Sequence, residues 1–341
     1  MFQDEEEGAM EEECDTIESV QFKKNGFYDY SFDNNSSQDD GSNDYQINGE
    51  SKLYPSYSTP MGDGIPWVTV REDETRSIEA EVKPYNSCDN LKLTGNGNAT
   101  LVADAYQNIQ LFGSMYPGQN NYFVEARRKE DNEIVGKLNV IASEEKDEIF
   151  NIKFVLIKQL GEEQYPSYGK SWVDIARSIK RIYHPLFIKL NFNTGNLIKK
   201  TVDFDKDGNG AFTNSNTERN SIINSITKEE GVHYVFIVDE MIKDSEGDNI
   251  NGFARMNRAY PNVQERPYAF VTTQSSNGSM TIPHELGHSI FGLKDVRDEF
   301  GQIYDPINIM NYGRQTGAKL KTYQILRILN LIDKLRPWDE E

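Results

Sequence analysis

Cysteine and histidine are both scarce in this sequence. Its 341 residues include two cysteines, Cys14 and Cys88, and four histidines. Two cysteines cannot build a disulfide framework, and without a Cys-x-x-Cys pair they do not form a structural zinc site. Zinc ligation by cysteine is therefore excluded, and both thiols are expected to be free.

Long hydrophobic runs are missing as well. No apolar stretch approaches the roughly 18 residues that cross a bilayer. The first residues, "MFQDEEEGAMEEEC", are acidic, whereas a secretory signal has a basic region followed by an apolar one. We therefore expect a chain made in the cytoplasm with no membrane span. Any export would use a leaderless route or a leader outside this sequence.

Lys and Arg are fewer than Asp and Glu, and the excess of negative charge is unevenly distributed along the chain. The net charge is −19, and residues 1–50 hold 15 Asp and Glu against two lysines, Lys23 and Lys24. The acidity is thus concentrated in a tail and says little about a substrate. It argues against nucleic acid as a partner, because phosphates bind to basic surfaces.

Composition divides the chain into three parts. Residues 1–64 are rich in Asp, Glu, Asn, Ser and Gly and bury too little apolar surface to offset ordering, which predicts a disordered tail. Residues 65–145 contain short alternating runs separated by turn residues, which predicts an all-β sandwich of immunoglobulin-like size. Residues 146–341 mix strand and helix patterns, so the fold class overall is α+β.

The third part has strongly patterned segments. Strands are expected at 150–160, 186–192, 232–241 and 268–274, and helices at 171–184, 217–226 and 319–335. The strand at 268–274 comes directly before the helix that holds two of the histidines. We expect this strand to pair with an extended substrate.

The stretch "TIPHELGHSIFGLKDV" (281–296) carries the strongest chemical signal. On a helix, His284 and His288 project from the same side one turn apart, so both imidazoles can reach one metal ion at about 2.0–2.1 Å. Glu285 projects from a neighbouring part of that surface. It can act as a general base on a metal-bound water without ligating the metal.

A catalytic zinc site needs a third protein ligand and an open position. Gly292 is expected to end the helix in a turn that brings a later residue back to the metal. Asp295 is the predicted third ligand, with Asp298 and Glu299 as alternatives. The other two histidines, His184 and His233, lie far upstream and are expected to be packing or surface residues.

The segment "DPINIMNYG" (305–313) follows this motif. H-E-x-x-H, a Gly turn with a third ligand and a Met in a tight turn together resemble the metzincin clan of zinc peptidases. The resemblance implies a mixed twisted sheet with helices, a zinc cofactor and a peptide or protein substrate. It also implies that Met310 forms a hydrophobic floor beneath the metal and that the hydroxyl of Tyr312 stabilises the oxyanion.

Two features depart from the common clan pattern. The third ligand comes one residue later, and it is Asp where most members have His. The layout of "HELGHSIFGLKD", "NIMNYG" and "KTYQILRIL" is similar to a group of bacterial zinc peptidase domains, many from Bacteroidetes, that often end toxins or secreted effectors. The resemblance covers roughly 150–341, and its specific part is 281–325. Two hypotheses follow. The first is a zinc endopeptidase, and the resemblance implies that it is a secreted or injected effector. The second is an inactive relative that serves as a binding or adaptor module.

A calcium site is a further hypothesis. "DFDKDGNGAFTN" (203–214) imitates a calcium loop, with Asp203, Asp205 and Asp207 followed by Gly208 at the sharp turn. Asn214 stands where such a loop has a bidentate Glu. A loop or hairpin rich in Gly and Asp, without an ion, is therefore the favoured interpretation.

Overall fold

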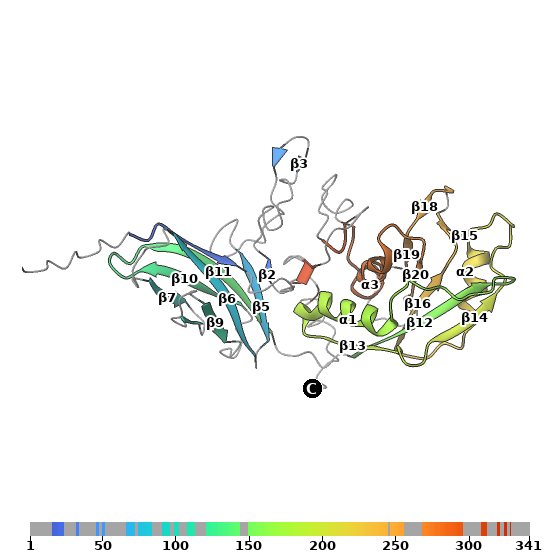
Figure 1. Cartoon of the computed structure of the whole chain (residues 1–341), viewed down its shortest axis with the longest axis horizontal. Helices are drawn as coiled ribbons and strands as arrows, with labels where there is room; N and C mark the ends of the chain where they lie inside the picture. The colour runs from blue at the N-terminus through green and yellow to red at the C-terminus, as the bar shows by residue number, and fades with distance from the viewer. Residues whose placement is uncertain are drawn as a thin grey trace, which may run out of the picture. The chain divides into compact units, whose positions relative to one another are not determined.

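The chain divides into two compact units (Figure 1), which are Met1–Asn34 with Ser58–Ser143, and Asn35–Tyr57 with Glu144–Glu341. The computed structural model describes residues 16–23, 32–33, 46–47, 50–51, 66–71, 74–83, 91–95, 99–101, 108–112, 121–143, 149–244, 246–255, 268–295, 308–311, 319–320, 324–325 and 328. Each unit has its own sheets and its own core.

The first unit contains two sheets. One has the strand order β1-β6-β9-β8, formed by Ser19–Lys23, Thr75–Lys83, Asn108–Phe112 and Ala99–Leu101. The other has the order β2-β5-β11-β10-β7, formed by Phe32–Asp33, Trp67–Arg71, Ile134–Ser143, Asn121–Arg128 and Leu91–Gly95. Pairing is antiparallel except between β5 and β11, which run parallel.

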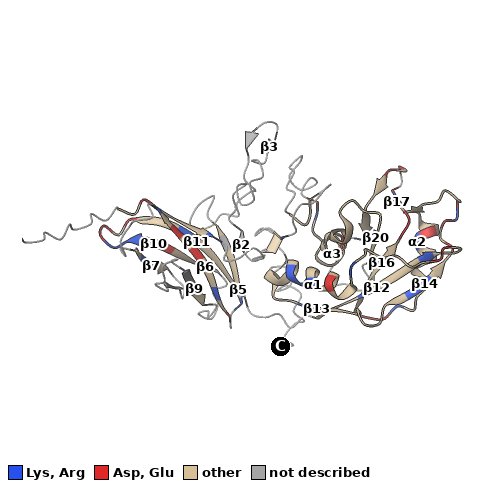
Figure 2. Ribbon diagram, viewed as in Figure 1, with Lys and Arg blue, Asp and Glu red and all other residues tan. Residues whose placement is uncertain are grey.

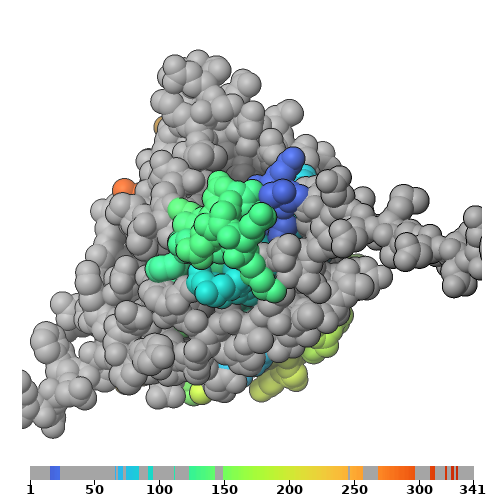
Figure 3. Space-filling model, turned by 90° about the vertical axis from the view of Figure 1, so that its left-hand side faces the viewer, coloured from blue at the N-terminus to red at the C-terminus, as the bar shows by residue number. Residues whose placement is uncertain are grey.

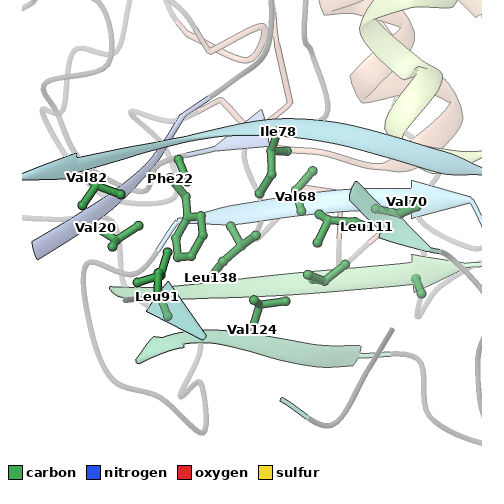
Figure 4. Packing of buried hydrophobic residues seen from close by; sticks show 14 of the residues in the cluster. Val20, Phe22, Val68, Val70, Ile78, Val82, Leu91, Leu111, Val124 and Leu138 are labelled. Atoms are coloured by element: carbon green, nitrogen blue, oxygen red, sulfur yellow. The ribbon is translucent and has the colours of Figure 1, made fainter. Parts of the chain in front are cut away.

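Both sheets contribute to one hydrophobic core. Ile78 of β6 and Leu111 of β9 belong to the first sheet, and Val68 of β5 and Leu138 of β11 belong to the second; all four are fully buried (Figure 4). Alternate residues along these strands point inward, as the period of two requires. The described strands therefore form the two-layered β structure that the alternation predicts. An immunoglobulin-like strand arrangement stays a prediction.

Strand β1 lies inside the segment that was expected to be a tail. Its residues alternate in burial, with Val20 and Phe22 in the core, and it pairs antiparallel with β6. Gly136 of β11 makes room for it, because a Cβ there would lie 2.6 Å from the Val20 carbonyl oxygen. In Figure 3 the blue residues of β1 lie beside the green residues of β10 and β11. The tail prediction is wrong for this strand, because the acidic composition of the segment hides a five-residue alternating stretch.

The second unit is built on a mostly parallel sheet. Its order is β13-β12-β16-β20-β19, from Lys189–Phe192, Ile149–Gln159, Val232–Val238, Tyr268–Thr272 and Gly252–Ala254. β12 pairs in parallel with β13 along its first half and with β14 (Ile198–Val202) along its second half. β19 is antiparallel to β20 and ends the order. The four strands predicted in this part are present, whereas β14 and β19 were not predicted.

Three α-helices accompany this sheet in the described part of the chain. They are α1 (Trp172–Tyr183), α2 (Asn216–Ile223) and α3 (Thr281–Phe291), with short 3-10 turns at η1 (His184–Leu186) and η2 (Gly278–Met280). α1 begins at Ser171, whose side chain accepts the Asp174 N–H, and it buries Ile175, Ala176, Ile179, Ile182 and Tyr183. The periodic pattern that predicts this helix places Trp172, Ile175, Ile179, Ile182 and Tyr183 on one face, and all of these except the half-buried Trp172 are buried.

Five short strands complete the described elements. β15 (Phe212–Thr213), β17 (Ile242–Lys243) and β18 (Asn249–Ile250) form a small sheet, and β3 (Gln46–Ile47) pairs with β4 (Glu50–Ser51). No helix among the described residues has the length and apolar character needed to cross a bilayer.

The C-terminal segment differs from its prediction at the start. A helix was expected from residue 319, but Lys319 forms an isolated parallel bridge with Asn308 and Leu320 is not helical. Gln324, Ile325 and Ile328 are helical and buried. The other apolar residues of the helix expected at 319–335 lie outside the described residues.

Both signs of charge are spread over the described elements, as Figure 2 shows. Lys153 of β12 pairs with Glu229 at 2.5 Å, and Arg177 of α1 pairs with Asp174 at 2.7 Å. Exposed pairs of this kind contribute little stability.

Candidate metal centre

The helix that carries the histidines ends as the sequence predicts. Gly292 adopts a left-handed conformation with φ of 61°, which a residue with a side chain rarely adopts. Its N–H bonds to the His288 carbonyl at 3.1 Å, and the Leu293 N–H bonds to the Gly287 carbonyl at 3.0 Å. This turn brings the chain back toward the histidine face of α3.

Three ligand-type side chains converge there. Asp295 Oδ1 lies 3.3 Å from His284 Nε2 and 3.5 Å from His288 Nε2, and the ligand atoms of all three residues lie within 4.8 Å of one another. The two imidazole rings stand at 88° to each other with centroids 4.8 Å apart. The structure thus brings together the three residues predicted as ligands. The alternatives Asp298 and Glu299 lie outside the described residues.

Backbone carbonyls determine which nitrogen of each imidazole carries the proton. His284 Nδ1 lies 2.8 Å from the Ile309 carbonyl oxygen, and His288 Nδ1 lies 2.6 Å from the Leu293 carbonyl oxygen. A carbonyl only accepts, so each Nδ1 must donate, and each Nε2, which faces Asp295, is the atom that would bind a metal ion once it carries no proton. A carbonyl that accepts from the other ring nitrogen in this way orients a metal-ligating histidine.

Two imidazole Nε2 atoms and a carboxylate oxygen face one another at close range, so protons or a cation must lie between them. Asp295 Oδ1 is buried and has no well-formed hydrogen bond to the described residues. A divalent cation would satisfy all three atoms at once. Two imidazoles and one carboxylate with an open position suit a catalytic zinc ion.

The charges around this group are strongly coupled. Burial alone raises the pKa of Asp295, but the two imidazoles outweigh it and hold that pKa well below its usual range. Burial alone lowers the pKa of His288, but Asp295 and Glu285 outweigh it and raise the pKa to about 9. The carboxylate therefore stays ionised, as a metal ligand must.

Glu285 lies beside this group in a closely packed position. It is 4% exposed, and its Oε2 has no hydrogen-bond partner among the described residues. Burial, followed by smaller and opposed effects of the imidazoles and Asp295, raises its pKa. Gly252 of β19 leaves room for it, because a Cβ at Gly252 would lie 2.9 Å from Glu285 Oε1.

A cleft of about 450 Å³ opens over these side chains. Its described lining comprises His284, Glu285, His288 and Asp295, residues 249–254 of β18 and β19, and Asn277, Thr281 and Asn311. The candidate metal ligands and the candidate base therefore share one open site with the edge of the sheet.

Met310 lies directly beneath α3. It is fully buried, and a Cβ built at Gly287 would collide with its sulfur. Gly287, the residue before His288, therefore permits the close approach of Met310 to α3, and the role of Met310 as a floor beneath a metal stays a prediction. Tyr312 lies outside the described residues, so its predicted role in stabilising the oxyanion stays a prediction.

Several residues near the centre were not predicted to belong to it. The Tyr183 hydroxyl of α1 donates to the Pro283 carbonyl at 2.6 Å, which holds the first turn of α3. His233 of β16 lies 2.9 Å from the hydroxyl of Ser289, which follows a candidate ligand. Asn308 and Gln324 form a buried pair behind Met310. The spacing of Gln324 and Ile328, one helical turn apart, is the signal that could have revealed the buried position of Gln324.

The predicted calcium loop forms a different group from the one expected. Asp205, Asp207 and Glu218 lie close together, whereas Asp203 pairs with Lys206 at 2.8 Å. Backbone N–H groups already occupy these carboxylates: Asp205 accepts from residues 209 and 210, and Glu218 accepts from residues 206 and 213. These bonds stabilise the loop, and the calcium hypothesis stays a prediction.

Comparison with solved structures finds a distant likeness. No protein-family model matches the sequence, and no curated protein matches it. Among solved structures, archaemetzincin from Methanopyrus kandleri is similar over 54% of this chain and 96% of its own, with 13% identity and a TM-score of 0.36. So distant a likeness carries no argument, and the assignments below rest on the described residues.

Proposed function

We propose that this protein is a zinc-dependent endopeptidase. The observation that carries the proposal is the convergence of two imidazole Nε2 atoms and one carboxylate oxygen beside a buried glutamate. His284, His288 and Asp295 would hold the ion. When bound, zinc supplies Lewis acidity and lowers the pKa of a coordinated water molecule.

Glu285 is the general base in this proposal. Its carboxylate takes a proton from the attacking water and afterwards gives it to the leaving amine. Burial raises the pKa of Glu285, so its carboxyl group retains that proton at a higher pH than an exposed glutamate would. The hydroxyl of Tyr312 would then donate to the oxyanion, as the resemblance implies.

The edge strand β19 offers a binding surface for an extended peptide. The Thr272 N–H bonds to the Asn251 carbonyl and the Arg255 N–H bonds to the Tyr268 carbonyl, so residues 251 and 255 face β20. In an antiparallel pair the orientation alternates, and the backbone groups of Gly252 and Ala254 therefore point away from β20. A substrate strand that pairs with them would lie along the cleft that Glu285 lines.

This assignment corrects the sequence-based prediction for residues 268–274. β20 was expected to pair with the substrate, but β16 occupies one of its sides and β19 occupies the other. A strand whose two edges are already paired cannot add a third neighbour. We assign the pairing with substrate to β19, which no sequence pattern predicted.

The test compares wild type with Glu285→Gln and with Glu246→Gln, which makes the same chemical change at an exposed glutamate outside the cleft. Glu285→Gln should lower casein or peptide hydrolysis by about 10²- to 10⁴-fold, because a general base contributes that much. Elemental analysis should still find one zinc ion per chain. Unchanged hydrolysis by Glu285→Gln would refute the proposal.

The second candidate, an inactive relative that acts as a binding module, has a distinct outcome. Stoichiometric zinc without hydrolysis of any peptide in a diverse library would favour it. Export or injection as an effector rests on the resemblance alone. Loss of growth inhibition on Glu285→Gln substitution would support that use.

A further inference from the structure

We infer that Gln324, on the C-terminal helical segment, is a positioning residue for the metal centre and acts through Asn308 and the turn at 308–311. The inference rests on the proposed zinc site and deepens it. Gln324 contacts none of the candidate ligands; its effect passes along hydrogen bonds that end at His284 Nδ1.

The turn at 308–311 presents the carbonyl that orients His284. The Ile309 carbonyl accepts from His284 Nδ1 at 2.8 Å, while the Ile309 N–H donates to the Lys319 carbonyl at 2.9 Å. The next residue, Met310, donates its N–H to Asn308 Oδ1 at 2.9 Å. The Asn308 side chain therefore closes the turn around the peptide group that holds the imidazole.

Gln324 holds that side chain in place. Its Nε2 donates to Asn308 Oδ1 at 3.1 Å, and both residues are buried, at 1% and 0% exposure. A buried amide pair restricts side-chain rotation, because any other rotamer would leave polar atoms unsatisfied. Gln324 thereby fixes Asn308 Oδ1 opposite the Met310 N–H. Without this donor the turn loses one of its attachments to the C-terminal segment.

A purely structural role would have a different signature. Ile328 lies one helical turn after Gln324 and is fully buried, so it packs the same segment without reaching Asn308 by a hydrogen bond. Loss of packing at Ile328 would lower stability. Loss of the Gln324 donor would instead change the direction of the Ile309 carbonyl, and with it the His284 ring and the geometry of the bound ion.

The experiment measures the zinc dissociation constant of the full chain by competition with a chromophoric chelator. The variants are Gln324→Met, Asn308→Ala, the double variant, and the control Ile328→Ala. We expect Gln324→Met to weaken zinc binding about 10-fold or more, as substitutions of residues that orient metal ligands do. Ile328→Ala should lower the melting temperature with a change in affinity below about 3-fold. In the double variant, Gln324→Met should add nothing to the effect of Asn308→Ala.

Cobalt substitution supplies a readout that packing alone does not change. The visible d–d absorption of the Co²⁺ protein should shift in Gln324→Met and remain as in wild type in Ile328→Ala. If Gln324→Met does not fold, Gln324→Glu keeps the shape of the side chain and replaces the donor by an oxygen, and the same loss is expected. Wild-type affinity and spectrum in the folded variant, or equal losses in Gln324→Met and Ile328→Ala, would overturn the inference. A wild-type chain that binds no zinc would instead refute the proposed function.

Discussion

Two glycines, Gly252 and Gly287, leave space that the candidate centre uses. Gly252 borders the carboxylate of Glu285, and Gly287 borders the sulfur of Met310. Neither glycine has a positive φ, so backbone conformation does not explain why glycine occupies these two positions. The close approach of another side chain explains it.

Substitution of Gly252 should move the candidate base. In Gly252→Ala the new methyl group would lie 2.9 Å from Glu285 Oε1 and 2.7 Å from the Phe270 carbonyl oxygen. We expect hydrolysis to fall at least about 10-fold with zinc content unchanged, since misplacement of about 1 Å can cost 10²-fold. Gly195→Ala, whose Cβ meets nothing within 4 Å, is the control. Equal activity in the two variants would contradict this account.

Buried His233 should make the metal-free protein less stable in acid. Burial lowers the pKa of His233 from 6.5 to about 3. Between these values the unfolded chain binds a proton that the folded chain does not, so stability rises with pH across this window. The slope for one proton is ~1.4 kcal/mol per pH unit.

The measurement is urea unfolding of the metal-free protein at pH 6, 5 and 4. His233→Phe lacks this group, so its free energy of unfolding should fall less steeply toward pH 4 than that of wild type, by ~1.4 kcal/mol per pH unit. His184→Phe, at an exposed position, should keep the wild-type slope. A parallel pH dependence in wild type and His233→Phe would show that His233 takes up its proton in the folded state.

At the scale of elements, sequence patterns predicted some helices and strands and missed several short strands. The helix α1 and the strands β12, β16 and β20 carry periodic apolar residues over five to twelve positions. They were therefore predicted with nearly correct bounds. β19 has three residues, too few to establish a period, and β1 and β14 have five residues each that mix apolar side chains with polar and charged ones.

The role of β1 can be tested at Phe22. Phe22→Ala should destabilise the first unit by about 3–5 kcal/mol, because it removes a buried aromatic side chain from the core. Gln21→Ala, at the exposed neighbouring position, is the control and should change stability by less than about 0.5 kcal/mol. If Phe22→Ala leaves the first unit as stable as Gln21→Ala does, β1 is not part of its core.

At the scale of the molecule, two units with separate cores imply separate responses to metal. The candidate ligands belong to the second unit. Free zinc at a concentration about 1,000 times its dissociation constant would stabilise that unit by about 4 kcal/mol, because an ion that binds only the folded state shifts the equilibrium by mass action.

Scanning calorimetry with and without a chelator tests this expectation. Metal removal should abolish hydrolysis and lower the melting temperature of one transition, and restored zinc should reverse both effects. The transition of the first unit, identified by its shift in Phe22→Ala, should stay in place. A shift of both transitions would mean that the two units unfold together.

The chemistry of the candidate centre follows from one short stretch of sequence. The i, i+4 spacing of His284 and His288, the neighbouring Glu285 and the turn at Gly292 are local features, so a single helix and its end suffice to specify them. The groups that surround these residues could be identified only from the packing of the whole unit. The edge strand at Gly252, the carbonyl of Ile309 and the buried pair of Asn308 and Gln324 come from distant segments, and contacts between distant segments form only when the chain packs.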